Sequence, residues 1–209
     1  GSYVAKYRPS TRNIVSNAWL MKCVGRPVFC APNLGIGGYL GSAYAPVFVG
    51  SDKNNPSMDD FKPPQIYDLG DPVVLAKRRR LLEKIESKAL SQDSKGKDWS
   101  NLRELGYDAM TRSEGREAFE MDRETPKMRD RYGRHPLGQN MLLARRMVEA
   151  GVRYVTVNGW AGQADHETNG PPASSWDMHG GNMGMGNAFG NGSYGMGFCL
   201  PRLDQALAA

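Results

Sequence analysis

The sequence has little of what marks several large protein classes. Its three cysteines form no CxxC pair and match no Cys/His spacing of structural zinc, which excludes a disulfide framework and a zinc module. We expect buried thiols, although Cys23 and Cys30 could pair in an oxidising compartment. No window approaches about 18 consecutive apolar residues, which excludes a membrane-spanning helix. A signal-peptide pattern and a GxSxG elbow are also missing, so no covalent nucleophile is visible.

Acidic residues are missing from the first 51 positions, and this accounts for the net charge of +5. Five of the 27 basic residues lie there, which leaves 22 to balance the 22 acidic ones in the rest of the chain. The one dense basic run, 77–80, is followed within two turns by Glu83 and Glu86, a pattern typical of a solvated helix face. Nucleic-acid binding usually needs a clustered basic stripe, so we expect no nucleic-acid partner.

A chain of 209 residues suits one domain or a piece of one. It begins Gly1-Ser2-Tyr3 and stops at Ala209 inside a predicted helix, so we expect an internal fragment, a single partial domain over 1–209. Glycine and proline make the segment 1–70 loop-rich, with β-leaning runs at 27–30 and 45–49. A helical segment, 71–151, and a segment 152–209 with a strand, a glycine-rich loop and the start of a helix complete the predicted order.

Several helices are predicted between residues 71 and 151. The first begins at Asp71-Pro72, because Asp is a good N-cap and Pro suits the first turn. One apolar stripe follows at helical spacing: Val74, Leu75, Leu81, Leu82, Ile85 and Leu90. Further helices are expected over 99–110, from about residue 113, from Thr125-Pro126 to Gly133, and over 136–150. The last ends at Gly151, and its expected buried stripe is Leu137, Met141, Ala144 and Val148.

The β-branched run 152–157 follows that helix after a one-glycine turn, which indicates a strand of an α/β fold. The helix should then lie against one face of the sheet. Loops at the carboxyl ends of parallel strands are where such folds build their sites. Here that loop begins at Asn158, and eight of the eighteen residues from 180 to 197 are glycine. Chemistry-bearing residues are therefore expected in this loop.

The loop contains Trp176-Asp177-Met178-His179. Asp177 and His179 are two residues apart on an extended segment, so they project to the same side and can share one cation. Two ligands are too few, so partners must come from elsewhere, and the alternative is a surface loop whose Asp and His only make hydrogen bonds. Asp165-His166-Glu167 could add ligands or a general base. The third histidine, His135, precedes a helix and is expected to cap it or to lie at the core edge.

Methionines near His179 leave one further alternative, because thioether and imidazole ligands suit Cu(I). The same methionines are also plain gap-fillers in a glycine-rich loop. They are Met178, Met183, Met185 and Met196.

Several segments, in this order, resemble the uncharacterised, sulfatase-like family called domain of unknown function 1501. They are 37–46, 118–119, 128–133, 138–139, 142–157, 176–179 and 203–207, and together they extend over almost the whole chain. The block ending at Val157 and the Trp-Asp-x-His motif are its most specific parts. The family's Asp-x-His falls on Asp177 and His179, with Met178 where Thr is usual. A long insertion, 159–175, separates this motif from the strand.

The resemblance implies an alkaline-phosphatase-like α/β fold, a doubly wound, mostly parallel sheet with a helical insert, here incomplete at both ends. It implies a divalent metal ion at the strand ends, with Asp177 and His179 as ligands, and a catalytic residue outside the chain. It also implies twin-arginine export to the periplasm or cell envelope. The expected function is a fragment of a sulfatase- or phosphatase-like ester hydrolase, inactive alone, acting on a small-molecule or polysaccharide ester. The alternative is a non-catalytic envelope or binding protein that keeps the fold.

Overall fold

A computed structural model describes most of the chain. The described residues are 1–12, 14–21, 36–64, 71–86, 103, 106–107, 113–162 and 196–209.

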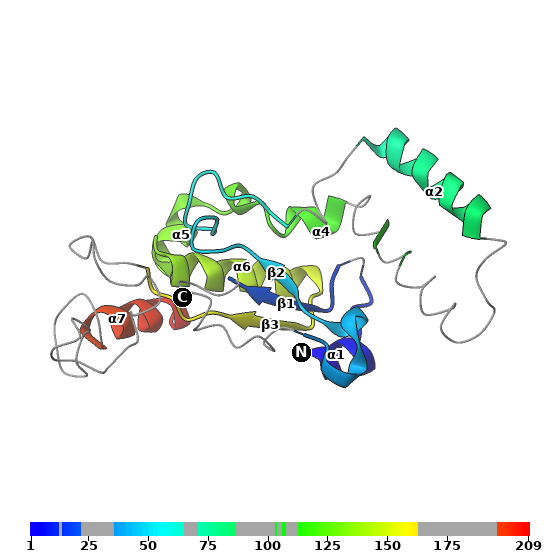
Figure 1. The fold of residues 1–209 in the computed structure, drawn as a ribbon. Coiled ribbons are helices and arrows are strands. Elements are labelled where there is room, and N and C mark those ends of the chain that lie inside the picture. Colours follow the sequence, from blue (N-terminus) through cyan, green and yellow to red (C-terminus); the bar gives the residue numbers. More distant parts are fainter. Residues whose placement is uncertain are drawn as a thin grey trace.

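The centre of the fold is a three-stranded parallel sheet (Figure 1). Its strands are β1 (Asn17–Leu20), β2 (Val47–Val49) and β3 (Tyr154–Val157), in the order β2-β1-β3. Ala18 pairs with Val47 on one side and with Val155 on the other. The sheet with its helices confirms the predicted mixed α/β class, with β2 and β3 where strands were expected. The central strand β1 was not predicted.

Helix α6 (Pro136–Ala150) packs along one face of this sheet, as predicted (Figure 1). Its Leu142, Leu143 and Met147 are fully buried in one core cluster with Ala18 and Leu20 of β1. The helix ends at Gly151, whose φ of 114° is a left-handed conformation that favours glycine. This turn returns the chain directly into β3.

The buried face of α6 differs from the predicted stripe. Leu137 is buried as expected, and Met141 is partly buried against the core. Val148, predicted to be buried, is 57% exposed. The buried positions instead include Leu143 and Met147, because the sheet lies on one side of α6 while α5 and α7 contact it elsewhere. The prediction for Val148 was wrong because it assumed a single narrow stripe.

The short helix α5 (Pro126–Tyr132) and the longer α7 (Met196–Leu207) both contact α6. Thr125 caps α5 as predicted, since its hydroxyl accepts a hydrogen bond from the Met128 N–H at 3.2 Å, and Gly133 ends it. The α7 helix was expected from Pro201 and starts five residues earlier. The remaining short elements are α1 (Ser2–Tyr7), η2 (Gly38–Leu40), η3 (Ser42–Tyr44), α4 (Ser113–Glu117) and η5 (Met121–Arg123).

Helix α2 (Pro72–Glu86) starts where the sequence predicted. The Asp71 carboxylate accepts a hydrogen bond from the Val73 N–H at 2.8 Å. In Figure 1 this helix stands at one end of the molecule, away from the sheet. Its apolar residues are not in the core: Val74, Leu81, Leu82 and Ile85 are exposed. None of the described helices is both long and apolar enough to cross a membrane.

The sheet face opposite α6 carries Trp19, Phe48 and Thr156. All three are half-buried, and the rings of Trp19 and Phe48 lie 6.2 Å apart. The described residues therefore show a helix layer packed on one face. Helices on both faces, and the alkaline-phosphatase-like fold itself, stay predictions.

Candidate functional site

The carboxyl edge of the sheet is the part of this fold where a ligand site is expected. In the order β2-β1-β3, the chain crosses from β1 to β2 on one side and reaches β3 on the other. In α/β folds, ligands bind outside the carboxyl ends of the strands at such a reversal, which here lies between β1 and β3. The residues that leave these strands are Met21 after β1 and Asn158 after β3. Both therefore lie at this edge of the sheet.

Two backbone hydrogen bonds hold this edge together. The Met21 N–H donates to the Val49 carbonyl at 2.7 Å, and the Asn158 N–H donates to the Leu20 carbonyl at 3.0 Å. Met21 is fully buried with a φ of 60°, and among the described residues it is the one non-glycine residue with a positive φ. A left-handed conformation is costly for such a side chain. The backbone strain therefore lies at the carboxyl end of β1.

Trp160 lies at the same edge and contacts Met21. The Asn158 side-chain oxygen accepts a hydrogen bond from the Trp160 backbone N–H at 3.2 Å, which fixes the turn after β3. Trp160 is only 8% exposed, and its buried Nε1–H has no hydrogen-bond partner among the described residues. A buried donor without a partner is costly and rare. An acceptor for it would have to come from outside the described residues.

His135 caps the amino end of α6, as the sequence predicted. Its Nδ1 accepts a hydrogen bond from the Gly138 N–H at 3.1 Å, while Nε2 is buried and has no partner. Burial, and to a smaller extent the positive charge of Arg202, lowers the pKa of His135 from 6.5 to about 4. The imidazole is therefore neutral at neutral pH.

Helix α7 places Cys199 and Arg202 near this end of α6. Cys199 is fully buried in a small cluster with Leu137 and Ala161. Burial raises the pKa of the Cys199 thiol from 9.0 to about 11, against the opposing effect of Arg202. The thiol is therefore protonated at neutral pH and is not a nucleophile. This agrees with the buried thiol predicted from the sequence.

The predicted metal ligands lie outside the described residues. This holds for Asp177, His179 and the second cluster 165–167, so their geometry stays a prediction. Of the methionines that could suit Cu(I), only Met196 is described, at the start of α7. Within the described ranges, no group of three or more His, Cys, Asp or Glu side chains could hold a metal ion.

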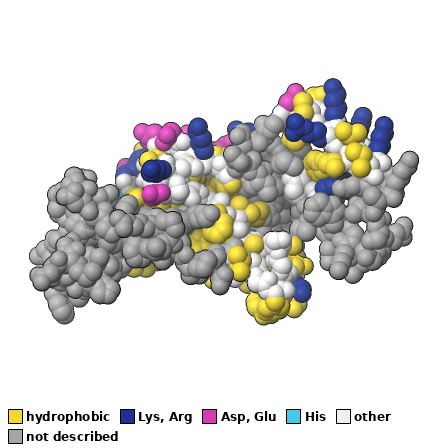
Figure 2. All heavy atoms as spheres, viewed as in Figure 1, with side chains coloured by type: hydrophobic (Ala, Val, Ile, Leu, Met, Phe, Trp, Pro, Cys, Tyr) yellow, Lys and Arg dark blue, Asp and Glu magenta, His cyan; other side chains and the backbone are white. Residues whose placement is uncertain are grey.

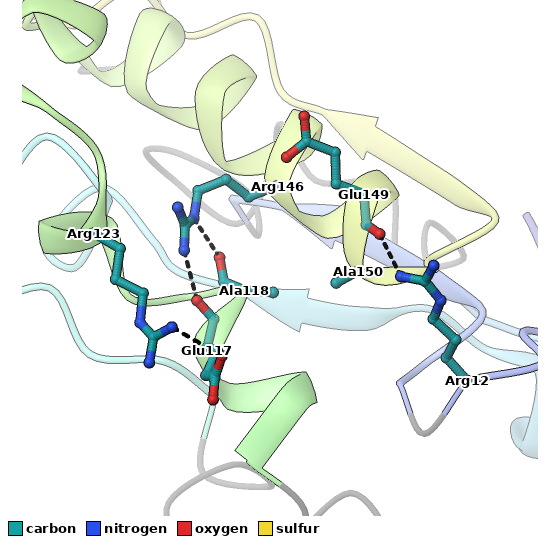
Figure 3. A pocket seen from close by; sticks show the side chains of 7 residues that line it. All are labelled: Arg12, Glu117, Ala118, Arg123, Arg146, Glu149 and Ala150. Carbon is teal, nitrogen blue, oxygen red and sulfur yellow. Dashed lines mark hydrogen bonds and ion pairs between the residues drawn. The ribbon is translucent and has the colours of Figure 1, made fainter.

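A pocket of about 610 Å³ lies at the opposite end of α6, near the amino ends of the strands (Figure 3). Arg146 crosses it and is tied to the segment before η5: its guanidinium donates to the carbonyls of Ala118 at 3.0 Å and Glu117 at 2.6 Å. Arg12 donates to the Glu149 carbonyl at 2.7 Å. These arginines form hydrogen bonds between segments that are far apart in the chain. Holding the fold together therefore accounts for the charged side chains that line this pocket.

Neither Met21 nor the indole of Trp160 was predicted as a site residue from the sequence. The residues before Met21 form a strand of only four residues, Asn17–Leu20, so no sequence pattern marked its end. Arg146 is half-buried, and nothing in the sequence distinguished it from the neighbouring Arg145.

A family model described as "Protein of unknown function (DUF1501)" matches residues 7–209. No curated protein and no solved structure matches the chain.

Proposed function

Because the chain belongs to the DUF1501 family of proteins of unknown function, we propose that it is part of an exported, metal-dependent ester hydrolase of the alkaline phosphatase type. One observation carries the proposal: β3 ends at the carboxyl edge of a parallel sheet, and Asp177 and His179 follow β3 in the sequence. In parallel sheets, this edge is where ligands bind. The proposed substrate is a sulfuric or phosphoric ester.

The proposed metal ligands are the carboxylate of Asp177 and the imidazole of His179. These two donor types together suit a divalent ion such as Zn²⁺. When bound, such an ion polarises the sulfuryl or phosphoryl oxygens and lowers the pKa of the attacking group. The other ligands and the nucleophile are proposed to come from sequence beyond this chain.

The described edge contributes a hydrogen-bond donor rather than a nucleophile. The buried Nε1–H of Trp160 has no partner among the described residues, and an oxygen of the proposed ester substrate would satisfy it. The Cys199 thiol is protonated, which leaves it unsuited to attack. This fits a role for the chain in holding metal and substrate, with the attacking group supplied elsewhere.

Metal binding by the chain is the direct test. We expect the purified chain to bind Zn²⁺ or Mn²⁺, measured by calorimetry, and Asp177→Asn or His179→Gln to weaken binding about tenfold or more. Asp122→Asn and Asp204→Asn are the matched controls, since they remove the same charge at exposed positions on other elements. Equal binding by all variants, or loss only in the controls, would contradict the assignment of Asp177 and His179.

An activity assay distinguishes the proposed hydrolase from the alternative, a non-catalytic binding protein. The full reading frame should hydrolyse an aryl sulfate or aryl phosphate, whereas the 209-residue chain alone should not. The ligand set of the full frame is a second discriminator: an N-terminal Asp pair and a downstream Asp-His would complete a metal site. Hydrolysis by the chain alone would overturn the view that its nucleophile lies elsewhere.

The alternative is a non-catalytic envelope or binding protein that retains the fold. If the full frame has apolar residues at the remaining ligand positions and hydrolyses neither ester, the binding protein is the better assignment.

A further inference from the structure

Helix α2 carries an unusual number of exposed apolar side chains for a helix of fifteen residues. The exposed fractions are 60% for Val73, 41% for Val74, 60% for Leu81, 38% for Leu82 and 59% for Ile85. Figure 2 shows these hydrophobic side chains interleaved with basic ones at the end of the molecule where α2 lies. An exposed apolar face of this kind marks an interaction surface.

Three of these residues form one row along the helix, which we call the α2 row: Val74, Leu81 and Ile85. They are spaced by seven and four residues, which places them on the same side of a helix. Lys77 and Arg78 flank the row, three and four residues after Val74. Both are exposed. The row is therefore a narrow apolar strip with a positive charge on each side.

The other side of α2 faces the protein. Leu75 and Arg79 are half-buried, and the Arg79 guanidinium lies 5.5 Å from the centre of the Tyr107 ring. A cation over an aromatic face is an attractive contact. It holds this side inward, which leaves the α2 row directed outward.

The net charge of α2 indicates which kind of partner the α2 row binds. Residues 72–86 contain five basic and two acidic residues, a net charge of +3. A protein groove that received the row would need an acidic partner for Arg78 beside its apolar floor. At the surface of a bilayer with anionic headgroups, the anions lie directly above the apolar acyl chains. Long basic side chains can therefore extend to the headgroups while the α2 row is buried among the acyl chains.

We propose that α2 binds the surface of an anionic lipid bilayer, lying in the plane of the membrane with the α2 row buried among the acyl chains. The helix is about 22 Å long, too short to span a bilayer and long enough to lie on one. Lys77, Arg78 and Arg80 then contact the anionic headgroups. This proposal is independent of the hydrolase activity.

Sedimentation of the whole chain with lipid vesicles tests the proposal. We expect binding to vesicles of equal parts phosphatidylglycerol and phosphatidylcholine, weakened by salt, and little binding to phosphatidylcholine alone. The double variant Leu81→Ser/Ile85→Ser should bind at least about tenfold more weakly, because it removes buried apolar surface. Lys77→Gln/Arg78→Gln should lose about fivefold for each charge removed.

Matched controls lie on other elements. Val148→Ser/Leu207→Ser removes two exposed apolar side chains, and Lys53→Gln/Lys127→Gln removes two exposed lysines. Both should bind like the unchanged protein. Absence of vesicle binding, equal binding to both lipid mixtures, or α2 variants that match their controls would each overturn the proposal. So would self-association that Leu81→Ser/Ile85→Ser abolishes in the absence of vesicle binding, since a second copy would then occupy the row.

Discussion

At the scale of single residues, the two ring nitrogen atoms of His135 lie in different environments. Its Nδ1 satisfies a backbone N–H at the start of α6, whereas its Nε2 is buried without a partner. Protonation would place a positive charge in this partly buried position, close to Arg202. The pKa of about 4 follows from these two costs, burial being the larger.

This pKa predicts a loss of stability in acid. The unfolded chain takes up a proton at His135 near pH 6.5, but the folded chain does so only near pH 4. Stability is therefore fully present above about pH 6.5 and falls as the pH drops toward 4, by roughly 1–3 kcal/mol for a partly exposed ring. His135→Asn keeps a capping oxygen and removes the titration.

Urea unfolding of both proteins at about pH 7 and about pH 4.5 checks this. Other groups titrate in both proteins, so the quantity to compare is the difference between them. The unchanged protein should lose more stability than His135→Asn. A constant difference at both pH values would show that His135 has an ordinary pKa.

At the scale of elements, caps and turns were the most predictable features. Thr125 and Asp71 begin helices where the sequence placed them, and Gly133 and Gly151 end helices at their predicted positions. These signals depend only on residues within a few positions of the helix end, so they do not depend on how the rest of the chain packs. The buried face of α6 was less predictable, because it depends on neighbours that arrive from distant parts of the chain.

Core packing of α6 gives a prediction at this scale. Leu143→Ala should lower the free energy of unfolding by about 2–5 kcal/mol, because Leu143 is fully buried between α6 and the sheet. The matched change Val148→Ala, on the same helix, should alter it by no more than about 0.5 kcal/mol. Chemical denaturation measures both. A larger loss for Val148→Ala than for Leu143→Ala would mean that α6 packs in the orientation first expected from the sequence.

At the scale of the whole molecule, Gln139 joins three segments through one side chain. Fully buried in α6, it donates to the carbonyls of Arg129 at 2.9 Å and Gly133 at 2.8 Å. Its oxygen accepts from the Arg129 guanidinium at 2.8 Å, and the same guanidinium donates to the Pro56 carbonyl at 3.0 Å. Helices α5 and α6 are thereby tied to the loop that follows β2.

Removing this link should destabilise the fold. Gln139→Met keeps the volume but leaves two carbonyls and one guanidinium N–H unpaired, at a cost of about 2–4 kcal/mol. Gln205→Met is the control, since Gln205 is exposed and makes one hydrogen bond, to the Asp130 carbonyl. Thermal unfolding followed by circular dichroism should show a clearly lower Tm for Gln139→Met only. An unchanged Tm would show that the network contributes little.

The sequence predicted much of the fold but less of the candidate site. Strand β3 was visible as a β-branched run, whereas β1 has four residues, of which Asn17, Ala18 and Leu20 are buried. A strand of four residues is too short to show an alternating pattern that could be recognised in the sequence. The predicted ligands Asp177 and His179 lie outside the described residues, and the orphan indole of Trp160 could not be foreseen, because hydrogen-bond partners depend on the folded neighbours.

By itself, the sequence determined the α/β class, both ends of α5 and α6, the start of α2, the DUF1501 family and the character of α2 as a basic, apolar helix. Each of these depends on residues that are near one another in the chain, or on an ordered series of motifs. Only the tertiary structure decided that β1 is central, that α6 buries Leu143 rather than Val148, and that the α2 row faces solvent. Burial is a property of pairs of surfaces, and which surfaces meet is settled when the whole chain folds.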